Sequence, residues 1–394
     1  MLGLWGWLLL NAGAVCKKNN IDMKTIWFWL AWFTVALGTL SGYLKIKNWG
    51  VFWDADVYKT AVVNWQSGVS PYFTDGTLPY LYPPISLDVF NLIPIDARTM
   101  AVVFNLFGFV FLMRTLLRLS SGIGQPLSFG WFHRLLPVGV VASFGGAVWV
   151  ALASGNIGFG FHSWIVALLL SCSGRQKLQV ITMGVIALAC AFKPVFALYL
   201  MYFLWSRPLK IGIATFVMGA ILCALPLMLD ALLRPELFAE FTDALGSRLA
   251  SDDVGRGLFA LAQYPLGGPV VVLTGVILLA LVIYVIRTVA HQDRADPRRA
   301  MDAVVLISIL ICLNPRLKEY DLAVAVVAVC LVGRHLLPFL PPALLSGIVA
   351  LSWMPDPGIL LALVILTLLF LYYGRHHRHV DDHPPEVQIP ISKN

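Results

Sequence analysis

Apolar runs close to the length needed to cross a bilayer recur along most of this chain. A helix needs about 20 predominantly apolar residues to span the hydrocarbon core, and runs of this kind include residues 26–44, 84–119 and 211–229. Backbone groups in lipid must be hydrogen-bonded within their own segment, so these runs are expected to be helices. A membrane barrel would instead alternate apolar and polar residues in units of about ten. The pattern therefore predicts an all-α polytopic membrane protein.

Charge and cysteine content agree with this class. Charged residues make up 12% of the chain, about half the fraction of a soluble domain. The basic residues behind the net charge of +7 cluster in short loops between apolar runs, as the positive-inside rule produces. The charge therefore does not indicate nucleic-acid binding. The six cysteines lie mostly in apolar runs without a CxxC pair, so neither a disulfide framework nor a zinc site is expected.

The runs and their flanking charges predict a bundle of about twelve transmembrane helices with both termini in the cytoplasm. Residues 1–25 form an N-terminal cytoplasmic or interfacial segment, and 26–373 form the transmembrane domain. Residues 374–394 are charged and contain proline, which predicts a disordered cytoplasmic tail. The run 178–204 is interrupted at Lys193-Pro194. We expect two short segments that meet there rather than one long kinked helix.

Three external loops follow from this topology, at 45–98, 230–267 and 314–321, and the unusual polar residues gather on their side. Asp54 and Asp56 come just after the first span. A carboxylate at the mouth of a membrane bundle suggests a site, although two solvated loop carboxylates are an equal alternative. Residues at i and i+2 point in different directions, so we expect only one of the pair to face a common site.

Cations lie on the same predicted side. The segment Pro315–Asp321 holds Arg316, Lys318 and Glu319, and an Arg fork beside a Lys suits a phosphate group. A connecting loop with internal ion pairs is the alternative. Lys193 either binds the same anion or extends to the headgroups. Asn156 follows Gly155 in an expected turn and either serves that turn or binds sugar. His162 is expected to be a packed polar residue.

Several short motifs occur in a characteristic order, and together they resemble glycosyltransferase family 87. These are the polyprenol-phosphate-mannose-dependent mannosyltransferases of the GT-C fold class. The likeness covers residues 54–321. Its late motif departs from that of the mycobacterial members, which carry Ser-Pro and a histidine there, whereas this chain reads Asn314-Pro315-Arg316-Leu317-Lys318-Glu319-Tyr320. The motifs are Asp54-x-x-x-Tyr58, Gly68-x-x-Pro71-Tyr72, Tyr82-Pro83-Pro84, Gly155-Asn156, Lys193-Pro194 and Pro315-Arg316 with Tyr320.

The resemblance implies a membrane glycosyltransferase of class EC 2.4 with a GT-C-like bundle. It implies a polyprenyl-phosphate donor of mannose or another hexose or pentose, and an extracytoplasmic glycan or glycolipid acceptor. The expected location is the bacterial inner membrane, with the active site on the periplasmic side. The aspartate four residues before the tyrosine carries the catalytic role, which assigns it to Asp54.

The chemistry of the residues is consistent with this assignment. A polyprenyl phosphate leaves without protonation, so the reaction needs a base for the acceptor hydroxyl and cations for the phosphate. One carboxylate in direct displacement inverts the anomeric centre. Asp54 is the expected base, and no metal or cofactor is required. The expected phosphate ligands are Arg316, Lys318 and Lys193, and the expected substrate-binding residues are Asp56, Tyr58, Tyr82, Asn156, Glu319, Tyr320, Arg248 and Arg256.

Two other hypotheses belong to different classes. A lipid-linked-sugar flippase or another transporter would carry ionisable residues near mid-span, broken helices and internal repeats. The chain shows few mid-span charges and no clear repeat. A catalytically inactive subunit that holds a partner enzyme is the third hypothesis. The absence of a Walker loop, an HExxH, a GxSxG or a dinucleotide fingerprint gives no support to nucleotide, zinc or serine chemistry.

Overall fold

The computed structural model is entirely helical in the part of the chain that it describes. That part covers a few isolated positions within 33–47 and 268–276 and the ranges 50–73, 78–93, 96–121, 131–171, 176–206, 208–250, 299–314, 318–334, 336–337, 340–354 and 358–381. Its elements are α3 (Trp53–Gln66), α4 (Ile85–Leu92), α5 (Ala97–Ser121), α6 (Trp131–Ser143), α7 (Ala147–Ser154), α8 (Ile157–Ser171), α9 (Gln176–Cys190), the 3-10 helix η1 (Pro194–Leu200), α10 (Met201–Ser206), α11 (Leu209–Leu233), α12 (Pro235–Ala250), α14 (Arg299–Cys312), α15 (Glu319–Val332), α16 (Pro342–Ser352) and α17 (Gly358–Asp381).

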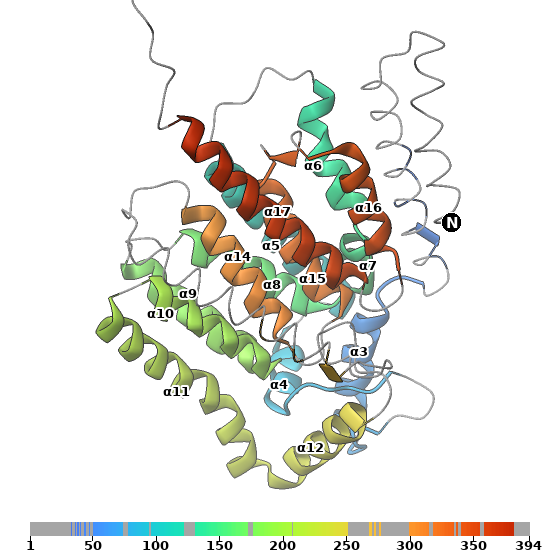
Figure 1. The fold of residues 1–394 in the computed structure, drawn as a ribbon. Helices are drawn as coiled ribbons and strands as arrows, with labels where there is room; N and C mark the ends of the chain where they lie inside the picture. The colour runs from blue at the N-terminus through green and yellow to red at the C-terminus, as the bar shows by residue number, and fades with distance from the viewer. Residues whose placement is uncertain are drawn as a thin grey trace, which may run out of the picture.

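Helix α15 forms the centre of the bundle (Figure 1). It packs against α5, α6, α7, α8, α14 and α17. From Leu322 to Val332 every residue of this helix is at most 3% exposed. A helix that is apolar on all sides must be covered on all sides, and the surrounding helices supply that cover. The hydrophobic core of the molecule therefore lies around α15.

Helix α11 has the opposite character, because much of its apolar surface is open. Leu225, Met228 and Leu232 are 47%, 57% and 74% exposed, as expected for side chains that face lipid. α5 and α11 are long and apolar enough to cross a membrane, and α6 with α7 would form a third crossing if this bent pair is one span. These helices support a membrane protein. The expected number of about twelve crossings is not confirmed within the described residues.

The difference arises because several apolar helices are too short to span lipid. α8 has 15 residues and so extends about 22 Å, against a hydrocarbon core of about 30 Å. Sequence windows register such a helix as a span because its composition is apolar. α17 differs from expectation at its other end, because it continues to Asp381, past residue 374, where the disordered tail was expected to begin.

Two breaks shape the middle of the chain. α6 and α7 meet at an angle of 65°, where Gly145 and Gly146 have φ angles of 57° and 70°. A Cβ at Gly145 would lie 2.5 Å from Ile359 Cγ1, so this turn also allows α17 to approach closely. At the second break α9 ends, Lys193 is extended, and η1 begins at Pro194. α9 and η1 pack against each other and α11 packs on both, so two segments meet at Lys193, as expected.

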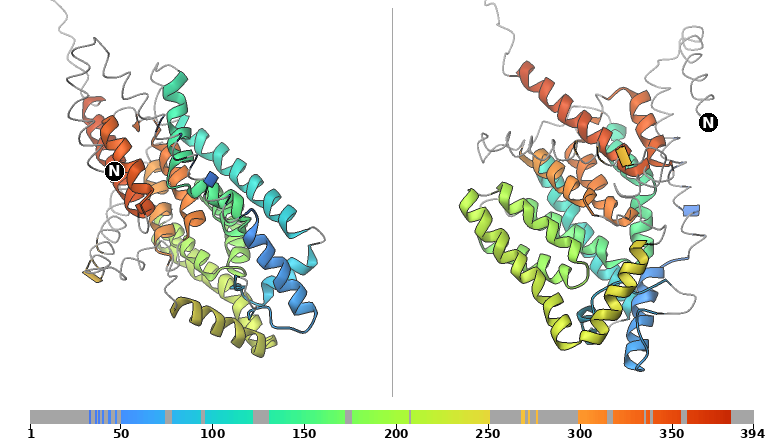
Figure 2. Two further views of the ribbon diagram at one scale, coloured as in Figure 1. Left: turned by 90° about the vertical axis from the view of Figure 1, so that its right-hand side faces the viewer. Right: turned by 60° about the horizontal axis from the view of Figure 1, so that its bottom comes forward.

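α3, α4 and α12 gather at one end of the bundle (Figures 1 and 2). Ser70 Oγ donates a 2.6 Å hydrogen bond to Glu240 of α12. Asp230 near the end of α11 accepts a 2.9 Å bond from the Ile85 N–H at the start of α4. Arg234 forms an ion pair with Asp88 of α4, joining the same elements. Two of the expected external loops, 45–98 and 230–267, are therefore tied together.

Candidate active site

The site begins where the chain enters α3. Phe52, directly before this helix, has a φ of 65° and is the only described non-glycine residue with a positive φ. Its N–H donates a 2.6 Å hydrogen bond to the carbonyl of Ala153 at the end of α7. A bulky side chain in the left-handed region costs energy, and this bond helps to hold the turn. The first turn of α3, with Asp54, is thereby fixed against the end of α7.

The turn between α7 and α8 brings Asn156 to the same place. Gly155 has a φ of 69°, and a Cβ there would lie 3.1 Å from the Cβ of Ala55. Glycine is therefore favoured both by the backbone conformation and by the close approach of α3. The Asn156 backbone is held by the Ser154 hydroxyl at its N–H, 3.1 Å away, and by the Asn105 amide at its carbonyl, also 3.1 Å away.

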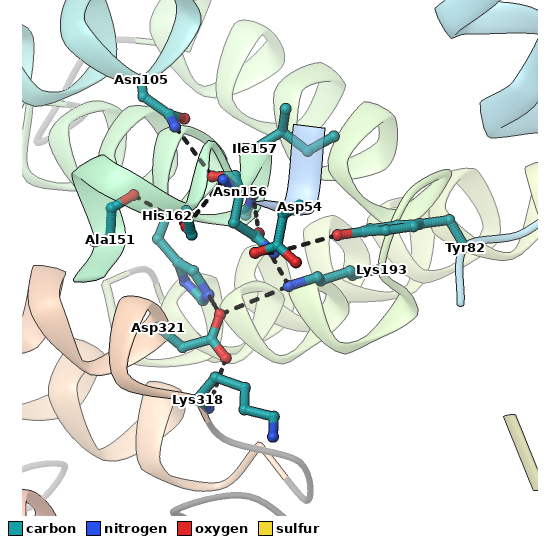
Figure 3. A network of polar contacts seen from close by, with 12 residues as sticks. Asp54, Tyr82, Asn105, Ala151, Asn156, Ile157, His162, Lys193, Lys318 and Asp321 are labelled. Carbon is teal, nitrogen blue, oxygen red and sulfur yellow. Dashed lines mark hydrogen bonds and ion pairs between the residues drawn. The ribbon is translucent and has the colours of Figure 1, made fainter. Parts of the chain in front are cut away.

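The Asn156 side-chain amide lies between the two charged groups of greatest interest (Figure 3). Its Nδ2 donates to Asp54 Oδ2 at 3.0 Å, and its Oδ1 accepts from Lys193 Nζ at 3.4 Å. Oδ1 also accepts from the Gly158 N–H at 2.7 Å, which is the bond of an N-cap residue at the start of α8. One buried amide therefore caps a helix and sets the spacing between a carboxylate and an ammonium.

The Lys193 ammonium has aromatic and anionic neighbours. Nζ lies 4.9 Å from the ring centre of Tyr320 and 5.8 Å from that of Tyr82, within the range of cation–π attraction. The nearest Asp321 oxygen is 3.8 Å away. These contacts and the Asn156 bond are longer than the 2.7–2.9 Å of a strong charge-assisted hydrogen bond. An anionic oxygen at hydrogen-bond distance from Nζ would form a shorter bond than any of these contacts.

Behind Lys193 is a buried polar chain. His162 of α8 contacts Asp321 of α15 through Nε2 at 3.1 Å and the Tyr199 hydroxyl of η1 through Nδ1 at 2.6 Å. The other oxygen of Asp321 accepts the Lys318 backbone N–H at 3.0 Å. His162, Asp321 and Tyr199 are at most 3% exposed. Their contacts join α8, η1 and α15 beside the carboxylate–ammonium pair.

Two tyrosines close the site next to Asn156. The hydroxyls of Tyr58 and Tyr82 lie 2.9 Å apart, and Tyr82 also lies 3.4 Å from Asn156 Nδ2. Tyr58 sits one turn after Asp54 on α3, and Tyr82 precedes the two prolines that lead into α4. Burial raises the pKa of both hydroxyls above the usual range. Both phenols therefore remain protonated at neutral pH and cannot serve as a base there.

Asp54 is the carboxylate with the properties of a base. It lies in α3, outside the apolar spans, and burial raises its pKa above the usual range of an aspartate. The hydrogen bond from Asn156 and the charge of Lys193 oppose this rise. A carboxylate whose pKa is raised toward the working pH accepts a proton more effectively than an ordinary one.

Asp56 faces a different environment, as the i, i+2 spacing predicted. It accepts two hydrogen bonds from the Arg98 guanidinium, at 2.7 and 2.8 Å, and these lower the pKa of its carboxyl. Asp56 borders a depression of about 240 Å³ whose lining includes Trp53, Thr60 and Tyr80. Asp56 lies on a different face of α3 from Asp54. No described contact joins it to the Asn156 network, so its expected role in substrate binding stays a prediction.

The remaining expected ligands are placed unevenly. Lys318 lies directly before α15, and its charge is close enough to Asp54 to favour the ionised carboxylate. Glu319 is the first residue of α15, and Arg248 lies within α12. Arg316 and Arg256 lie outside the described residues. Among the described residues no group of three or more His, Cys, Asp and Glu could hold a metal ion.

Three residues of the network were not expected to be part of it. His162 appeared to be a packing residue, Tyr199 carried no motif, and Asp321 was considered only as a partner for cations of its own loop. Their contacts join positions 37 and 159 residues apart along the chain. A histidine inside an apolar run was the only available signal, because such a residue needs polar partners when it is buried.

Comparison with known proteins gives a family but no individual relative. The family model described as glycosyltransferase family 87 matches residues 80–314. The match includes Tyr82, Asn156 and Lys193, and it begins after Asp54 and ends before Asp321. No curated protein and no solved structure matches the chain. Because the matched segment covers more than half of the chain, the protein belongs to glycosyltransferase family 87, whose members are membrane enzymes of the GT-C class.

Proposed function

We propose that this glycosyltransferase moves a sugar from a polyprenyl-phosphate donor to a glycan or glycolipid acceptor on the extracytoplasmic side of the membrane. The observation that supports it best is the arrangement at Asn156. Its two amide atoms bind Asp54 and Lys193, so a single amide bridges a carboxylate and an ammonium. Transfer from a phosphate donor needs this pair, because a proton must leave the acceptor while negative charge develops on the phosphate.

The proposed step is a direct displacement. The acceptor hydroxyl oxygen attacks the anomeric carbon, its proton passes to Asp54, and the bond from the anomeric carbon to the phosphate oxygen breaks with its electron pair. The configuration inverts, because one displacement occurs from the face opposite the leaving group. Lys193 stabilises the departing phosphate, with Lys318 and Arg316 as further cations. Such stabilisation is often the largest single contribution to catalysis.

Asp54 is assigned as the base because the other candidate groups are committed elsewhere. Tyr58 and Tyr82 keep their protons. Asp56 is held by Arg98, and both ring nitrogens of His162 have partners within the protein. Asp54 has a raised pKa and lies beside the ammonium. Burial of a carboxylate costs stability, and a catalytic role would explain why this cost is retained at Asp54.

The test replaces Asp54 with asparagine, which keeps the size and an acceptor for Asn156 but cannot take up the proton. Purified protein in lipid nanodiscs would be incubated with a panel of polyprenyl-phosphate sugars and membrane extract, and products would be identified by mass. We expect Asp54→Asn to lower kcat by about 10³-fold or more, since general base catalysis contributes about 10²–10⁴-fold. The matched control is Asp243→Asn on the exposed face of α12, which should stay within about twofold of wild type.

The same assay separates the alternatives. A folded Asp54→Asn protein with full activity would remove Asp54 as the base. Translocation of labelled lipid-linked sugar without any glycosyl product would indicate a flippase and would overturn the proposed transfer.

A further inference from the structure

The buried chain formed by Tyr199, His162 and Asp321 has no direct role in the proposed transfer. All three side chains are closed to solvent, so none can touch an acceptor hydroxyl without rearrangement. Polar groups in such a place cost stability unless each is hydrogen-bonded. The chain ends at the Lys193 ammonium, 3.8 Å from Asp321 Oδ1.

The hydrogen bonds of this chain are all satisfied by one arrangement of protons. The Tyr199 hydroxyl donates to His162 Nδ1, and the protonated Nε2 of a neutral imidazole donates to Asp321. Asp321 is then ionised. It accepts hydrogen bonds from His162 and from the Lys318 backbone N–H, and it forms an ion pair with Lys193 at 3.8 Å. The histidine carries no charge in this arrangement. The only charges are the buried carboxylate and the ammonium that faces it.

The position of Asp321 ties Lys193 to the segment that precedes α15. One oxygen of Asp321 faces Lys193 and the other holds the backbone of Lys318. Tyr320, which lies between Lys318 and Asp321 in the sequence, places its ring centre 4.9 Å from the Lys193 ammonium. The start of α15 thus brings an aromatic face and a carboxylate next to Nζ, and the contact with Asp321 is drawn in Figure 3.

We propose that Asp321 is a positioning residue for Lys193, and that His162 and Tyr199 hold the Asp321 carboxylate in the orientation that this role needs. The inference rests on the proposed function, in which Lys193 meets the donor phosphate. Asp321 keeps the ammonium protonated and aligned with the carboxylate of Asp54 across the Asn156 amide. It does not contact substrate. Because its own negative charge repels a phosphate, Asp321 contributes by aligning the ammonium and not by attracting the donor.

The first test does not depend on any donor. Wild-type protein and Asp321→Asn in nanodiscs would be treated with limiting sulfosuccinimidyl acetate, and acetylation of each lysine would be followed by peptide mass spectrometry. An ion-paired ammonium reacts slowly because only the neutral amine is acylated. We expect Asp321→Asn to speed the modification of Lys193 by at least fivefold. Lys177, exposed at the other end of α9, serves as the internal reference and should not change.

The second test separates positioning from structural damage. Asparagine is close in shape to aspartate and keeps an oxygen for the Lys318 N–H, so the start of α15 should survive. We expect kcat to fall by about 10- to 100-fold, the range that small misplacements produce. The donor KM should stay within threefold or decrease, because removal of a negative charge relieves repulsion of phosphate. Asp302→Asn, which neutralises another buried aspartate in the first turn of α14, should leave both parameters within twofold.

The outcomes are distinct. Unchanged acetylation of Lys193 would overturn the inference whatever the donor is. A rise in donor KM that parallels the fall in kcat, together with a lower Tm, would assign Asp321 a structural role and would also overturn it. If wild-type protein formed no product from any polyprenyl-phosphate sugar, the proposed function would fail, and the acetylation result would still decide whether Asp321 positions Lys193.

Discussion

Replacement of Asn156 by aspartate tests the central contact of the site with little change in shape. The N-cap of α8 should survive, since a carboxylate oxygen can accept the Gly158 N–H in place of Oδ1 and acidic groups are favourable at a helix N-terminus. The N–H that now points at Asp54 becomes an oxygen, 3.0 Å from a carboxylate oxygen. Two carboxylates at that distance cannot both ionise readily.

The expected magnitude follows from the charges. Two like charges about 4 Å apart repel by about 4 kcal/mol at an effective dielectric constant of 20, and one pKa unit corresponds to about 1.4 kcal/mol. Lys193 offsets part of this repulsion. We therefore expect the acid limb of the pH–rate profile to move upward by about one to three units, with kcat at a pH below the limb falling by about tenfold for each unit. Activity should recover as the pH rises and the pair loses its shared proton.

The assay is the pH dependence of product formation, with Asn91→Asp as the matched control. Asn91 lies on α4 at the same end of the bundle, exposed and hydrogen-bonded to Gln66. The same added charge there should shift the limb by less than about 0.3 unit, because solvent screens it. If Asn156→Asp showed the wild-type limb while its Tm was unchanged, the proposal that Asn156 controls a catalytic Asp54 would be refuted.

Three further outcomes are expected. In the wild type, burial raises the pKa of Asp54 and the base acts ionised, so activity should fall as pH drops through a value above the ordinary 3.9 of aspartate; a limb at or below 3.9 would contradict this. Lys193→Met should lower kcat/KM for the donor by about 10²-fold, whereas the control Lys177→Met should not. Equal effects of the two substitutions would argue against a role of Lys193 in binding the donor phosphate. Gly155→Ala places a side chain at a φ of 69°, with its Cβ 3.1 Å from the Cβ of Ala55. It should lower the free energy of unfolding by about 1–3 kcal/mol, measured as the shift of thermal unfolding in detergent. An unchanged Tm would contradict the expected strain at this turn.

The sequence by itself determined the class of the protein and pointed to several residues of the candidate site. Apolar runs can bury themselves only as helices in a bundle, because backbone groups in an apolar medium must bond within their own segment. Motif order led to family 87, which the family match confirms. Asp54 and Lys193 were singled out because charged groups beside apolar runs are costly without partners, and the motif order of the resemblance added Asn156. The spacing of Asp54 and Asp56 also predicted that they face apart.

Tertiary structure decided which of those residues meet and which helices are long enough to cross lipid. Hydropathy windows measure composition, so they cannot distinguish α15, which is covered by protein, from α11, which is open to lipid. The partners of His162 depend on contacts across 37 and 159 residues, and no local pattern encodes such a distance. Asp321 entered the sequence analysis only through the alternative in which its loop forms internal ion pairs, because local pairing is the only pairing a sequence displays. Its contact with Lys193 exists because α8, η1 and α15 pack together, and this packing is a property of the whole bundle.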